Sequence, residues 1–166
     1  MDSGFTLIEL VVVVAIVAVM AATLLPRVWH LQREARIGNL QGTRGAMHAT
    51  ATLIHSAALA RNGQPDAAPC PGGGGTADNR LDGRGTVCTE SGLVAMQHGY
   101  PAATASGPSR LPGMVGGDGY IVTIDAQVAT IARADASVPA QCSFTYTEPL
   151  VARTAASISP ALVSGC

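Results

Sequence analysis

The sequence predicts an α+β fold, in which one long N-terminal helix packs on a small antiparallel β-sheet. The first observation behind this prediction is an apolar run over residues 5–25, followed by a helical repeat of apolar residues that continues to about Arg61. The second is a set of short β-branched stretches between residues 120 and 147. Three antiparallel strands can bury one face only against another element, so we expect the helix to cover the sheet.

The apolar run at residues 5–25 is long enough to cross a membrane. As a helix rising about 1.5 Å per residue it reaches roughly 30 Å, the thickness of the hydrocarbon core of a bilayer. Its one charged residue, Glu9, lies one turn inside the run. A charge placed there costs on the order of 3 kcal/mol, so Glu9 is expected to have a partner.

Cleavage between Gly4 and Phe5 would supply that partner, because it would create an ammonium group on Phe5. A group at the start of a helix lies one turn from the side chain four residues on, so the new amine could pair with Glu9 within one subunit or between neighbours. The alternatives are an ordinary secretory signal peptide or a plain single-span anchor. A signal peptide carries a basic n-region and no acid in its apolar core, and neither alternative explains Gly4 and Glu9 together.

These residues, with the Val/Ala/Ile run and Pro26, resemble the class III signal and N-terminal helix of type IV pilins and of the related type II secretion pseudopilins. In that family a prepilin peptidase cuts after the glycine and methylates the new phenylalanine amine. The resemblance therefore implies processing at Gly4 and Phe5, and it implies that Glu9 and Pro26 serve assembly. The leader has no Lys or Arg, so the positive-inside rule orients it weakly, and whether Met1 is the natural start stays open.

Two further stretches are similar to the MSHA-type branch of these pilins, the mannose-sensitive haemagglutinin pilins. They are residues 31–56 and the Gly-Tyr-Pro stretch at residues 98–104. The resemblance implies a subunit that sits in the inner membrane with its head in the periplasm and then joins an extracellular pilus for surface attachment. It implies three sets of partners, namely identical or homologous pilin subunits, prepilin peptidase and the inner-membrane assembly machinery. The alternatives are a type II secretion pseudopilin, a minor pilin for DNA uptake and a monomeric tethered binding module.

We divide the chain into a leader peptide at 1–4, a transmembrane or filament-core helix at 5–26, an amphipathic second half of that helix at 27–63 and a globular head at 64–166. Pro26 is expected to kink the helix rather than end it, because its neighbours are strong helix formers. One face of the second half should carry the head, and it consists of Ile37, Leu40, Met47, Ala51, Ile54 and Ala58.

The head is expected to depend on disulfides, because aromatic residues make up only 4% of the chain. Cys70, Cys88, Cys142 and Cys166 have no C-x2-C spacing, which disfavours a structural zinc site. Three connectivities are possible. We favour Cys70 with Cys88 and Cys142 with Cys166, since each pair closes a short loop that contains no other cysteine, in what would be the oxidising periplasm.

The rest of the head is predicted to be mostly loop with three strands. We expect a turn at Asp125-Ala126 inside the first hairpin. The predicted segments are a loop at 65–89, a short helix or turn at 90–98, a loop at 100–113 and strands at 120–124, 127–131 and 143–147.

The sequence predicts a protein that is not an enzyme and has no cofactor or metal. All ten basic residues are arginines, which excludes a P-loop lysine and a Schiff-base lysine, and they form no cluster that would bind nucleic acid. His48 and His55 share a helix face but lack a third ligand, so we interpret them as surface or packed histidines. Asp78, Asn79 and Asp82 could offer oxygens to calcium, although their spacing does not fit an EF-hand.

Overall fold

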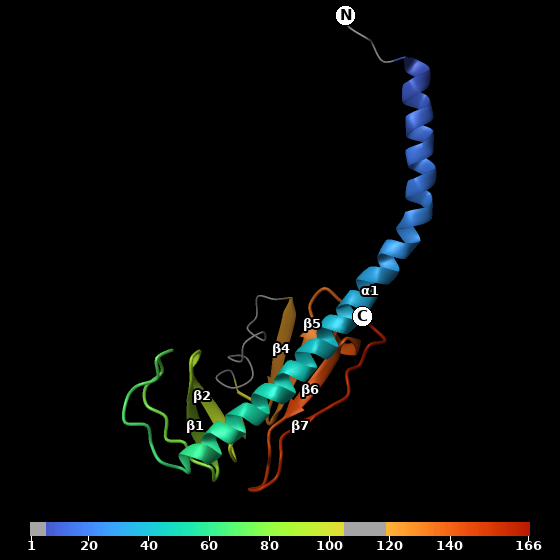
Figure 1. Cartoon of the computed structure of the whole chain (residues 1–166). Helices are drawn as coiled ribbons and strands as arrows, with labels where there is room; N and C mark the ends of the chain where they lie inside the picture. Colours follow the sequence, from blue (N-terminus) through green and yellow to red (C-terminus); the bar gives the residue numbers. More distant parts are fainter. Residues whose placement is uncertain (1–5, 105–118) are drawn as a thin grey trace, which may run out of the picture. The chain divides into compact units, whose positions relative to one another are not determined.

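The computed structural model describes residues 6–104 and 119–166. The chain divides into two compact units, Met1–Arg36 and Ile37–Cys166. The long helix α1, Leu7–Arg61, begins in the first unit and ends in the second (Figure 1). The helix continues through Pro26, so the proline does not end it, as the sequence indicated. Gly4, Phe5 and residues 105–118 lie outside the described residues.

The second unit contains two antiparallel sheets. The first has the order β1-β2-β3 and the second the order β4-β5-β6-β7. A short 3-10 helix, η2, covers Pro139–Gln141 between β5 and β6. The strands are β1 Arg84–Thr89, β2 Gly92–Gln97, β3 Tyr100–Pro101, β4 Tyr120–Asp125, β5 Val128–Arg133, β6 Ser143–Thr147 and β7 Ser157–Ile158.

The last half of α1 lies across both sheets and closes one core with them (Figure 1). Five of the six residues predicted for the packing face are at most 5% exposed, and Ile37 packs at the edge of the same core. From the sheets the core takes Val94 and Met96 of β2, Ile131 of β5 and the aromatic side chains of β6. The predicted α+β fold is therefore confirmed, with a long apolar helix followed by antiparallel sheets that pack on its second half.

The hairpin made by β1 and β2 was not predicted. The sequence indicated a loop up to residue 89 and a short helix or turn after it, but Arg84–Thr89 and Gly92–Gln97 pair along their whole length. Leu, Ala, Met and Gln are good helix formers, and they dominate the composition of β2. Alternate residues of β2 are nevertheless buried, so packing overrides helix propensity in this strand.

The predicted hairpin at residues 120–131 is present, with its turn displaced by one residue. Asp125 pairs with Val128, so the turn residues are Ala126 and Gln127 rather than Asp125 and Ala126. Ala126 has φ 50 and Gln127 has no positive φ, so only the first turn residue is left-handed, as in turns of the II′ class. The predicted third strand at residues 143–147 is β6, and it pairs with β5 and β7.

Two disulfides close loops at opposite ends of the second unit. Cys70 bonds to Cys88 with their Cα atoms 5.5 Å apart. Cys142 bonds to Cys166 with their Cα atoms 4.9 Å apart. These are the two pairings that the sequence favoured, and the second ties the C-terminus to the start of β6.

Candidate functional site at the N-terminal helix

The helix α1 begins with a capped first turn. The Glu9 N–H donates to the Thr6 carbonyl oxygen at 3.1 Å and lies 3.4 Å from the Thr6 hydroxyl oxygen. The Leu10 N–H also donates to the Thr6 carbonyl oxygen, at 3.3 Å. Thr6 is therefore the N-cap residue and Glu9 is the third residue of the helix. A carboxylate in this first turn stabilises the helix by about 0.3–1 kcal/mol, because it interacts favourably with the helix dipole.

The N-cap role of Thr6 was not predicted, although the sequence contains the pattern that indicates it. Thr6-Leu7-Ile8-Glu9 has the spacing of a capping box, in which a Thr at the N-cap is followed three residues later by Glu. The cap fixes where the helix starts. It therefore also places Glu9 in the first turn of the helix.

The side chain of Glu9 is exposed and has no cation near it on its own helix. From Thr6 to Leu24 it is the only charged residue, and the next charge along the chain is Arg27. Arg27 follows Glu9 by eighteen positions, which corresponds to about 27 Å along a helix. Between Thr6 and Leu24 the helix therefore has no cation that could pair with Glu9.

The helix around Glu9 exposes a continuous apolar surface. Leu7–Leu24 has a mean hydropathy of 2.8, none of it is buried, and by length and composition it can cross a membrane. Leu7 is 80% exposed and Val19 is 67% exposed. At about 25 cal/mol per Å² of buried apolar area, this surface strongly favours contact with lipid or with other apolar helices over contact with water.

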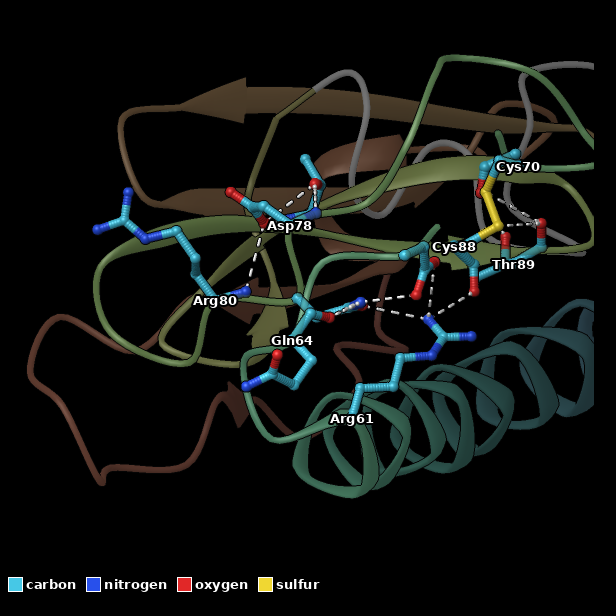
Figure 2. A network of polar contacts seen from close by, with 11 residues as sticks. Arg61, Gln64, Cys70, Asp78, Arg80, Cys88 and Thr89 are labelled. Atoms are coloured by element: carbon cyan, nitrogen blue, oxygen red, sulfur yellow. Dashed lines mark hydrogen bonds and ion pairs between the residues drawn. A yellow bond between two sulfur atoms is a disulfide. The ribbon is translucent and has the colours of Figure 1, made fainter. Parts of the chain in front are cut away.

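Polar residues at the far end of α1 join the helix to the loop that follows it. Arg61 donates to the Asn79 side-chain oxygen at 3.2 Å and to the Cys88 carbonyl oxygen at 3.4 Å (Figure 2). The Asn79 amide is fully buried and donates to the Gln64 carbonyl oxygen at 2.7 Å and to the Asp66 carboxylate at 2.8 Å. Asn79 is thus the hub of this network.

The carboxylate of Asp78, next to Asn79 in the sequence, is held by hydrogen bonds within the head. The Asp78 carboxylate accepts hydrogen bonds from the Thr86 N–H, the Thr86 hydroxyl and the Arg80 N–H. Burial alone would raise the pKa of Asp78, but these hydrogen bonds outweigh it and hold the pKa below its ordinary value. The candidate calcium ligands Asp78 and Asn79 both use a side-chain oxygen within the fold, since Asn79 accepts from Arg61 and Asp78 from Thr86 and Arg80.

A cavity of about 430 Å³ lies between the end of α1, the turn before β1, the turn between β2 and β3, and the β6–β7 loop. The ring of His55 stacks on that of Tyr100 with their centroids 4.1 Å apart. His55 therefore packs against the head, while His48 is exposed on the same helix. The cavity is lined by His55, Leu59, Leu81, Asp82, His98, Tyr100, Arg153, Thr154 and Ala155.

The capped, unburied apolar helix with one acidic residue is long and apolar enough to anchor the chain in a membrane, and it leads into an α+β head. Residues 1–25 match the family model described as the prokaryotic N-terminal methylation motif. The chain therefore carries a prepilin-type signal, the signal of type IV pilins and pseudopilins, which are structural proteins and not enzymes. In comparisons with curated proteins and with solved structures, no significant match was found.

Proposed function

We propose that this chain is a pilin subunit that is cleaved between Gly4 and Phe5, methylated on the new Phe5 amine and polymerised through its apolar helix. The observation that carries the proposal is the lone carboxylate of Glu9 on an unburied apolar helix. The match of residues 1–25 to the methylation motif supports the processing step.

The helix needs two interactions to leave the lipid and enter a filament. Burial of the Leu7–Leu24 surface against the helices of neighbouring subunits would replace its contact with lipid tails. A Phe5 ammonium of the same or a neighbouring subunit would neutralise Glu9, which would otherwise be an uncompensated charge in a medium of low dielectric constant. Pairing between neighbours would also set the axial register of the subunits.

Substitution of Glu9 tests the assembly step separately from processing. Glu9→Gln keeps the shape of the side chain and removes its charge, so we expect normal cleavage and a strongly reduced yield of filaments. Glu34→Gln is the matched control, because Glu34 is an exposed acid on the same helix but lies outside the apolar span. Filaments of the Glu9→Gln variant at the yield of the Glu34→Gln variant would show that the pairing is not needed.

We further propose that the filament is an MSHA-like surface pilus that serves attachment. The support is the similarity of residues 31–56 and of the Gly-Tyr-Pro stretch at residues 98–104 to that branch. In this proposal the subunit waits in the inner membrane with its head in the periplasm, and the assembly machinery then extracts it. Electron microscopy of filaments sheared from the cell surface tests this, because long surface fibres are expected, whereas a pseudopilin would give none.

A further inference from the structure

The turn between β2 and β3 has an unusual residue at its first position. Gln97 pairs with Tyr100, so His98 and Gly99 form a two-residue hairpin loop. His98 has φ 49 and Gly99 has φ 79, which is the pattern of a type I′ turn. Asn, Asp and Gly dominate this position because they accept the left-handed conformation most easily. A histidine at this position is therefore expected to make a side-chain contact that stabilises the turn.

His98 makes that contact with Gly83, in the turn before β1. The backbone N–H of His98 donates to the Gly83 carbonyl oxygen at 2.8 Å. In return the Gly83 N–H donates to Nδ1 of His98 at 3.2 Å. Nδ1 can accept this hydrogen bond only while it carries no proton, so the closed contact requires the neutral imidazole with its proton on Nε2.

Protonation of His98 removes the acceptor. An imidazolium carries a proton on both nitrogens, so Nδ1–H and the Gly83 N–H would then face each other as two donors. Histidine side chains ordinarily gain this proton near pH 6.5. Because only the closed form requires the neutral ring, acid favours the open form over the closed one.

Four other titratable or charged groups line the same cavity as His98. They come from α1, from the turn before β1, from β3 and from the β6–β7 loop, and are His55, Asp82, Tyr100 and Arg153. By the sign of its charge a carboxylate such as that of Asp82 favours an imidazolium, whereas a guanidinium such as that of Arg153 opposes it. Arg84, next to Gly83, is exposed and adds a weaker, solvent-screened repulsion.

We propose that the contact between His98 and Gly83 is an acid-sensitive latch. At neutral pH it holds the β2–β3 turn against the Gly83 turn and so fixes one wall of the cavity and the Tyr100 ring that stacks on His55. Acid opens it, because the imidazolium no longer accepts the Gly83 N–H. The latch belongs to the head and does not depend on the proposed polymerisation.

The His98→Asn variant should keep the contact with Gly83 at every pH, because asparagine does not gain a proton. Asn accepts positive φ readily, and its side-chain oxygen can take the place of Nδ1 as acceptor at every pH. The full-length chain in detergent micelles would be compared with this variant by hydrogen exchange of the Gly83 amide at pH 7.5 and pH 5.0, corrected for the intrinsic pH dependence of exchange. The other histidines are present in both proteins, so their titration cancels in the comparison.

We expect the protection of the Gly83 amide to fall by about fivefold in the wild-type protein at pH 5.0, the effect of losing one hydrogen bond. The His98→Asn variant should show no such fall. An equal fall in both proteins would overturn the proposal. Should the variant fail to fold, NMR of the wild-type protein alone tests the proposal. The Gly83 amide resonance must then shift together with the ring resonances of His98 as the pH is lowered. A Gly83 amide resonance that stays constant while the His98 ring is protonated would refute the latch.

Discussion

Replacement of Asn79 should destabilise the head more than its small size suggests. Its side chain is fully buried and makes three hydrogen bonds, two donated to Gln64 and Asp66 and one accepted from Arg61. Its backbone has φ 51, a left-handed conformation that Asn adopts more readily than Ala. Asn79→Ala therefore removes the hydrogen bonds and adds backbone strain at the same position.

The magnitude follows from these two effects. Leaving the partners of Asn79 without their hydrogen bonds costs about 2–3 kcal/mol, and a left-handed alanine costs about 1–2 kcal/mol. We expect Asn79→Ala to lower the free energy of unfolding by about 3–5 kcal/mol. Asn79→Gly removes the same hydrogen bonds without the strain of a side chain at positive φ, so its loss should be about 1 kcal/mol smaller.

Urea unfolding of the full-length chain in detergent, followed by circular dichroism, measures both losses. Asn39→Ala is a suitable control, because Asn39 is exposed on α1 and its replacement should change the free energy of unfolding by less than about 0.5 kcal/mol. A loss below about 1 kcal/mol for Asn79→Ala would refute the view that this residue joins the end of α1 to the loop after it. Equal losses for the Ala and Gly variants would refute the contribution of backbone strain.

Two further predictions concern two glycines and the carboxylate of Asp78. Gly42→Ala should raise the free energy of unfolding by about 0.5–1 kcal/mol, because its added Cβ meets open space, whereas Gly99→Ala should lower it, since Gly99 has φ 79 and a Cβ there would lie 3.1 Å from Nδ1 of His55. Denaturant midpoints of the two variants check this, and a loss of stability in Gly42→Ala would contradict it. The lowered pKa of Asp78 stabilises the fold above its unfolded value of about 4, and that contribution is lost as the pH falls below about 4. Unfolding measured at pH 7 and pH 3 should therefore show a smaller difference for Asp78→Asn than for the wild-type protein.

The helix and its packing face were predictable because they follow from local periodicity. Leu40, Met47 and Ile54 recur at the helical repeat, and all three are buried in the head. The apolar run before them is equally plain in the sequence. Neither depends on which distant residues the helix meets.

The missed elements depend on contacts between residues that are distant in the sequence. The strand β2 reads as helical by composition and becomes a strand only because β1 pairs with it. The sequence indicated Asn79 only as a possible calcium ligand in a loop, and its structural role requires Arg61 and Gln64 to be brought beside it. The capping role of Thr6 is different, because its spacing to Glu9 was visible in the sequence and was overlooked.

The central claim is that the carboxylate of Glu9 is tolerated in the apolar helix because an α-amine on Phe5 neutralises it. Mass spectrometry of the mature N-terminus, on protein isolated from its native cell, tests this most directly. We predict a chain that begins at Phe5 with a methylated amine. A chain that still carries Met1 to Gly4 would contradict the claim, because the neutralising amine would never have formed.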